Sequence, residues 1–122
     1  MSTVAAALVA LIAIEHVYIL IVEMFLWTTA YGRRAFALTE ERAAITAPLA
    51  KNQGLYNGFL AAGLAWALIA RDPAEAYHLK LFFSACVAIA GAYGGATAGK
   101  KILFLQGGPG LAALIATIVA GA

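Results

Sequence analysis

Long apolar stretches separated by short polar or glycine-containing segments make up most of the chain. A helix needs about 20 predominantly apolar residues to cross the hydrocarbon core of a membrane. Four stretches approach this length, so the pattern predicts an all-α fold, a four-helix transmembrane bundle. The chain is expected to form a single integral membrane domain, residues 1–122. Its predicted spans are about 3–30, 48–70, 74–99 and 102–121.

Glycine and proline mark where these spans end or change direction. Gly32, followed by two arginines, is expected to stop the first span, and Pro73 favours a turn between the second and the third. Pro109 lacks a backbone N–H and crowds the carbonyl four residues earlier. The fourth helix is therefore predicted to be kinked or broken at Gly107–Gly110. Thr39 is a good N-cap residue, so a short interfacial helix leading into the second span is expected, with a solvated connector as the alternative.

Composition supports a membrane protein and argues against a nucleic-acid partner. Hydrophobic residues make up 64% of the chain and charged residues 11%, against about 45–50% and about 25% in soluble domains. A formal net charge of +2 is too small to suggest a nucleic-acid partner. Because basic residues favour cytoplasmic loops, both termini are expected outside the cytoplasm, with the chain in the bacterial inner (cell) membrane. The residues that set this orientation are Arg33, Arg34, Arg42, Lys51, Lys100 and Lys101.

Three ionisable residues interrupt the first apolar stretch: Glu15, His16 and Glu23. A charge at the bilayer centre costs at least about 2.5–3.5 kcal/mol on insertion scales, so such residues usually face a protein interior or a watery cavity and have a function. At about 100° per residue, His16, Glu23 and Trp27 share one helix face, with Glu15 at its edge. We therefore expect Glu23, His16 and Glu15 to be the catalytic acid/base groups.

The second predicted span begins with a polar segment that should lie at the depth of Glu23. In an antiparallel hairpin, Glu23 is expected to meet Asn52, Gln53 or Tyr56. A ligand cavity is then expected between the first two helices, in their cytoplasmic half. No metal-ligand spacing accompanies these residues, so no metal is expected, and the sequence identifies no cofactor. The expected ligand-binding residues are Trp27, Asn52, Gln53, Tyr56, Asn57 and Tyr93.

Glycines recur at every fourth position on the third predicted span, at Gly91, Gly95 and Gly99. Small residues at this spacing let the backbones of neighbouring helices approach closely. The spacing predicts close helix packing, either within one chain or across a homo-oligomer that forms through these glycines.

Three strings of residues resemble the bacterial membrane-protein family known as domain of unknown function 1304. The strings are Glu15-His16-Val17-Tyr18-Ile19-Leu20, Glu23-Met24-Phe25-Leu26-Trp27 and Asn52-Gln53-Gly54-Leu55-Tyr56-Asn57-Gly58-Phe59. The resemblance spans most of the chain and fits its length. It implies a small four-helix membrane protein whose signature residues are these polar ones, and it implies no established activity.

Three functions fit this pattern. The first is binding of a membrane lipid or another small lipophilic molecule in an intramembrane polar pocket, with isomerisation by acid/base catalysis as the reaction. The second is proton-coupled transport by a dimer similar to small multidrug transporters, in which a first-helix glutamate exchanges protons for a cationic substrate. The third is a structural or assembly subunit, in which the polar residues join helices by hydrogen bonds.

Overall fold

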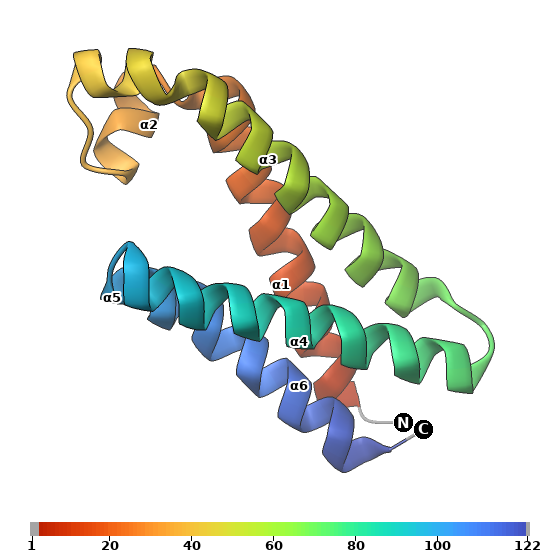
Figure 1. The fold of residues 1–122 in the computed structure, drawn as a ribbon. Helices are drawn as coiled ribbons and strands as arrows, with labels where there is room; N and C mark the ends of the chain where they lie inside the picture. The colour runs from red at the N-terminus through yellow and green to blue at the C-terminus, as the bar shows by residue number, and fades with distance from the viewer. Residues whose placement is uncertain (1–2, 122) are drawn as a thin grey trace. The chain divides into compact units, whose positions relative to one another are not determined.

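The computed structural model describes residues 3–121, and these residues form helices without β-strands (Figure 1). The predicted all-α class is therefore confirmed. Two of the elements, η1 and η2, are single π-helical turns that continue directly from the preceding α-helix. The elements in chain order are α1 (Thr3–Ile21), η1 (Val22–Leu26), α2 (Ala30–Ala35), α3 (Glu40–Ile69), α4 (Pro73–Thr97), α5 (Lys100–Ile102), η2 (Leu103–Gly107) and α6 (Gly108–Ala120).

Three helical stretches are long and apolar enough to cross a membrane: Thr3–Leu26, Pro73–Thr97 and Lys100–Ala120. In each, only 22% of the most apolar 18-residue window is buried inside the protein. Large exposed apolar surfaces of this kind mark membrane or protein contacts, which is consistent with a membrane protein. The predicted second span lies in α3. With 30 residues α3 is long enough to cross, but its amide side chains lower its mean hydropathy, so the four-helix bundle stays a prediction.

The polar connector forms a helix start at Thr39, but not a separate interfacial helix. The backbone N–H of Arg42 donates to Thr39 Oγ1 over 3.1 Å, which confirms the predicted cap. The helix that begins at Glu40 then runs without interruption through Pro48 to the end of α3. A short helix that was not predicted, α2, lies earlier in the chain, directly after the first span.

The irregularity in the last helix lies one turn before the predicted position. The π-helical turn η2 covers Leu103–Gly107, and the N–H of Gly108 donates to the carbonyl of Leu103, five residues back. Regular α-helix resumes at Gly108 with Pro109 in its first turn, where a missing N–H costs little. The chain thus accommodates Pro109 by changing its hydrogen-bond spacing ahead of the proline.

The described chain divides into two compact units, each of which is described by itself. Unit 1 comprises Met1–Ile14 and Leu60–Ala122, and unit 2 comprises Glu15–Phe59. In unit 1, α4 lies beside the helix formed by η2 and α6 (Figure 1). Its buried apolar cluster consists of Val9, Ile12, Leu64, Val87 and Ala113.

The glycines of α4 pack within the chain. A Cβ atom added to Gly91 would lie 2.1 Å from the backbone nitrogen of Gly107, and one added to Gly95 would lie 2.6 Å from the Cβ of Leu103. Gly99 instead forms the turn after α4, with a φ of 141° that favours glycine. Close packing at the glycine spacing is therefore present inside the monomer, while a homo-oligomer through these residues stays a prediction.

Candidate functional site

The carboxyl group of Glu23 is the centre of a polar contact inside unit 2. The side-chain amide of Asn57, on α3, donates to Glu23 Oε1 over 2.7 Å, and the same amide donates to the carbonyl of Gln53 over 3.0 Å. Glu23 itself lies in the π-helical turn η1, within the first membrane-spanning stretch. Such turns inside α-helices occur frequently at functional sites.

Two glycines on α3 bring this pair together. A Cβ atom added to Gly54 would lie 2.5 Å from Met24 Cγ and 3.1 Å from Glu23 Cβ, and one added to Gly58 would lie 2.7 Å from Leu20 Cδ1. The missing side chains let α3 approach the end of α1 and η1 closely. The Asn57 amide on α3 can therefore contact Glu23 in η1 directly.

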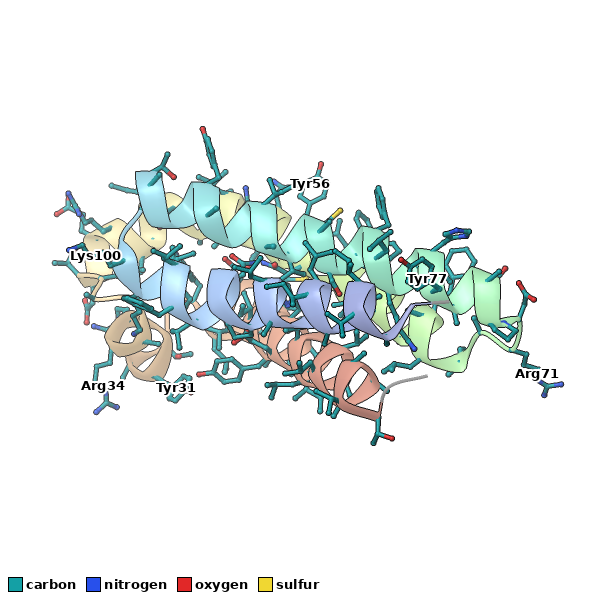
Figure 2. The ribbon with its side chains drawn as sticks, turned by 90° about the horizontal axis from the view of Figure 1, so that it is seen from below. Tyr31, Arg34, Tyr56, Arg71, Tyr77 and Lys100 are labelled. Atoms are coloured by element: carbon teal, nitrogen blue, oxygen red, sulfur yellow. The ribbon has the colours of Figure 1, made fainter. Side chains whose placement is uncertain are left out.

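The amide that meets Glu23 differs from the expected partners. Asn52, Gln53 and Tyr56 are exposed, and the Asn52 amide donates to the carbonyl of Pro48 on its own helix. The Tyr56 ring projects from the ribbon (Figure 2) and packs edge-on against Phe59 at a centroid distance of 5.7 Å. The physical reason is that the small residues Gly54 and Gly58 decide which face of α3 meets α1, and those three side chains point away from it.

The π-helical turn also changes the predicted alignment of Glu23 with the earlier ionisable residues. The rotation of about 100° per residue holds for an α-helix, but a π-helix pairs residue i with i+5 and turns less per residue. The α-helical geometry ends at Ile21, so a helical wheel with one α-helical period does not apply beyond that point. The common face of His16, Glu23 and Trp27 stays a prediction.

The other two ionisable residues lie in α1. His16 is fully buried. Glu15 is partly buried, and its Oε1 atom is buried without a hydrogen-bond partner among residues 3–121. A buried carboxyl oxygen that no protein group satisfies is costly, so a ligand or water that donates to it would be stabilised. At about 1.5 Å per residue, Glu15 lies roughly 12 Å along the helix axis from Glu23.

Trp27 is fixed by two residues that the sequence did not single out. Its indole Nε1 donates to Thr46 Oγ1 over 2.9 Å, and its ring lies 4.8 Å from the Phe36 ring, centroid to centroid. The Thr46 hydroxyl in turn donates to the carbonyl of Arg42 over 2.7 Å. Neither residue is charged or part of a recognisable motif, so no signal in the sequence pointed to them.

Tyr93, the remaining predicted ligand-binding residue, belongs to unit 1, on α4, where it is 71% exposed. Within the part of the chain that the structure describes, no group of three or more His, Cys, Asp or Glu side chains lies close enough to hold a metal ion. Two polar contacts of predicted site residues lie in unit 2, one around Glu23 and one around Trp27.

Comparison with known proteins identifies the family of this chain. The family model described as protein of unknown function (DUF1304) matches residues 10–118, so the chain belongs to this family, as its three strings of residues predicted. The chain is also 35% identical over 111 residues to the uncharacterised protein YpaA of Lactococcus lactis, covering 88% of this chain and 90% of YpaA. No solved structure matches.

Proposed function

We propose that this member of the DUF1304 family binds a small lipophilic molecule through Glu23 and Asn57, inside the membrane. The observation that carries the proposal is the 2.7 Å hydrogen bond between these two side chains, made by a carboxyl group in a π-helical turn of a membrane-spanning stretch. Ionisable groups are expensive at this depth and are by default functional. A carboxyl group has about four acceptor positions, so one bond from Asn57 orients it without saturating it.

The hydrogen bonds also suggest the chemistry of the ligand. An amide nitrogen carries two donors, and the donors of Asn57 are directed to Glu23 and to the carbonyl of Gln53. The groups that remain for a ligand are acceptors, the Asn57 carbonyl and the Glu23 carboxylate. A hydroxyl or amine on an otherwise apolar molecule fits this pair best.

The proposed reaction is an isomerisation in which Glu23 moves a proton. The carboxylate takes a proton from one atom of the ligand and returns it to another, so that no atoms or electrons are gained or lost. Acid/base groups removed from water work near neutral pH when their environment brings their pKa close to it. His16 and Glu15, both on the preceding helix, are the further acid/base groups in this proposal.

The test compares molecules that copurify with the wild type and with Glu23→Gln. The glutamine preserves the shape of the side chain and an acceptor for Asn57, but it removes the charge and the acid/base group. We expect mass spectrometry of purified protein to find a lipophilic hydroxyl or amine compound with the wild type and to find it depleted at least about tenfold with Glu23→Gln, in line with loss of one charge-assisted hydrogen bond. Glu41→Gln, at an exposed position in the first turn of α3, is the matched control.

Two results would overturn the proposal. Substrate-driven proton flux in liposomes that depends on Glu23 would show a transporter instead. A triple replacement of Glu15, His16 and Glu23 that changes only the melting temperature, with the copurifying molecules unaltered, would show that these residues join helices and do no chemistry.

The proposal includes a membrane arrangement. The apolar second half of α3 and its length support a fourth crossing, which would complete a four-helix bundle in a bacterial inner membrane. The basic residues after the first and third spans support a cytoplasmic position for those loops, with both termini outside. Accessibility of single introduced cysteines to an impermeant thiol reagent, in a Cys86→Ala background, tests this orientation.

A further inference from the structure

A second site is suggested by a basic pocket at the end of the first membrane-spanning stretch. The pocket has a volume of about 490 Å³, and all of its lining residues belong to unit 2. Two of them are arginines, and the others are apolar. The lining residues are Ala30, Arg33, Arg34, Ala37 and Leu38.

The position of the pocket next to the membrane is fixed by a close contact at Gly32. A Cβ atom added there would lie 2.0 Å from the carbonyl oxygen of Leu26, the residue at which the first spanning stretch ends. Thr29 holds the start of α2 by accepting from the N–H of Gly32 over 3.2 Å. Helix α2 is therefore packed against the end of the span, so in a membrane the two arginines that follow Gly32 would lie near the lipid headgroups.

Arg33 presents a buried donor that no described residue accepts. Its Nε atom is buried and has no hydrogen-bond partner within residues 3–121, although one of its terminal nitrogens lies 3.8 Å from the carboxylate of Glu40. Glu40 is 84% exposed, and exposed ion pairs of this kind contribute little. A buried guanidinium N–H without an acceptor is costly, so an acceptor that reached it would be stabilised.

Arg34 adds a second guanidinium to the same pocket. Its Nε donates to the carbonyl of Ala30 over 3.3 Å, which holds the side chain along α2 while its terminal nitrogens stay exposed. In Figure 2 the Arg34 side chain projects outward from α2. Both arginines line the pocket, and the planar donors of a guanidinium group match the geometry of phosphate oxygens.

The backbone at the pocket is strained. Ala37 has a φ of 53°, a left-handed conformation that costs a residue with a Cβ about 1–2 kcal/mol. The N–H of Ala37 donates to the carbonyl of Arg34 over 3.4 Å and that of Leu38 to the carbonyl of Arg33 over 2.8 Å, so Ala37 is the left-handed residue of a Schellman cap at the end of α2. Here it closes the loop after α2 and completes the wall of the pocket with Leu38.

We propose that Arg33 and Arg34 bind the phosphate group of an anionic phospholipid. Free inorganic phosphate has the same charge chemistry, but the location at the end of a span and the apolar Ala30, Ala37 and Leu38 favour a lipid, whose acyl chains lie in the adjacent bilayer. This site does not depend on the proposed function of Glu23, because the two involve different residues and different ligand groups.

Native mass spectrometry of the full chain in a neutral detergent tests the site with three probes: phosphatidylglycerol, phosphatidylcholine and inorganic phosphate. The wild type is expected to bind phosphatidylglycerol at least about tenfold more tightly than phosphatidylcholine, and Arg33→Gln/Arg34→Gln is expected to lose this preference. Lys100→Gln/Lys101→Gln, which removes the same charge from exposed positions, should keep it.

Arg33→Lys distinguishes a site with specific hydrogen bonds from simple charge attraction. It also tests the proposal if the double variant does not fold. Lysine keeps the positive charge but has no Nε–H donor, so we expect phosphatidylglycerol binding to weaken several-fold. Unchanged binding in both arginine variants would overturn the proposal. Equal weakening by the Lys100/Lys101 control would do the same, and so would complete displacement of the lipid by equimolar inorganic phosphate, which would assign the pocket to the free anion.

Discussion

The two units each contain a π-helical turn that faces glycines, but the contacts differ in kind. In unit 1, η2 lies against Gly91, where an added Cβ would meet backbone atoms of Gly107 at 2.1 and 2.2 Å. In unit 2, η1 lies against Gly54, where an added Cβ would meet the side chain of Met24 first, at 2.5 Å. One contact is backbone against backbone, and the other is made through side chains.

This difference separates a contact between two backbones from a contact between side chains that can adapt. A backbone cannot move aside, so the contact in unit 1 holds its two helices in one close arrangement. The contact in unit 2 holds a flexible methionine and a hydrogen-bonded carboxyl group, and such side chains can rearrange around a bound molecule. The same local device, a π-helical turn beside small residues, therefore gives a rigid interface in one unit and an adaptable polar one in the other.

The largest expected effect is that of Gly91→Ala. The added methyl group overlaps backbone that cannot relax, so we expect a loss of about 3 kcal/mol in the free energy of unfolding, or failure to accumulate folded protein. Reversible unfolding in mixed micelles of mild detergent and SDS measures this. Gly108→Ala is the control, because its nearest neighbour lies 4.0 Å from the added atom. Equal stability of the two variants would show that the backbone contact is not as close as described.

Gly54→Ala should cost less, about 1.5 kcal/mol, because the flexible Met24 side chain can move away. The prediction becomes sharper with a double variant. Met24→Ala removes the obstructing atoms, so Gly54→Ala should cost markedly less in that background when measured by the same unfolding assay. If the effects of the two substitutions on the free energy of unfolding are instead additive, Met24 does not limit the approach of α3. The distinction between a backbone contact in unit 1 and a side-chain contact in unit 2 would then be wrong.

Away from the glycine contacts, the two units should respond alike to loss of a helix cap. Thr39→Ala removes the cap of α3 and Asp72→Ala that of α4, where the N–H of Glu75 donates to Asp72 Oδ2 over 3.0 Å. Each is expected to lower the free energy of unfolding by about 1 kcal/mol. Thr39→Ser and Asp72→Asn keep a capping oxygen and should stay near wild type. A cap loss confined to one unit would indicate that the caps, and not only the glycines, distinguish the units.

The smallest expected effect concerns the hydrogen bond between Trp27 and Thr46. Hydrogen bonds between helices in membranes contribute about 0.6 kcal/mol on average, and we expect a coupling energy of that size. A double-mutant cycle with Trp27→Phe and Thr46→Val isolates it, since phenylalanine retains an aromatic ring near Phe36. A coupling energy near zero would show that Trp27 is positioned by aromatic packing alone.

Much of this arrangement could be predicted from local patterns. The cap at Thr39 and the turn at Pro73 follow from the conformational preferences of single residues, and the apolar stretches follow from their length and composition. Glu23 and Asn57 were both identified as site residues, but their pairing was not. Lys80, near the start of α4, is only 6% exposed, which its place near a helix end does not predict. Burial depends on what packs against a residue, and a single apolar helix does not encode that.

By itself the sequence determined that the chain is helical, that most of it is apolar enough for a membrane, and which ionisable residues lie within the apolar stretches. These properties depend on composition and on spacing along one helix. Only the tertiary structure decided that Asn57 meets Glu23, that Gly91 packs against Gly107, and that Arg33 has a buried donor without a partner among residues 3–121. Each of those depends on which helix faces lie against each other. The two π-helical turns change the rotation of the side chains that follow them about the helix axis, and a uniform helical period does not reveal this change.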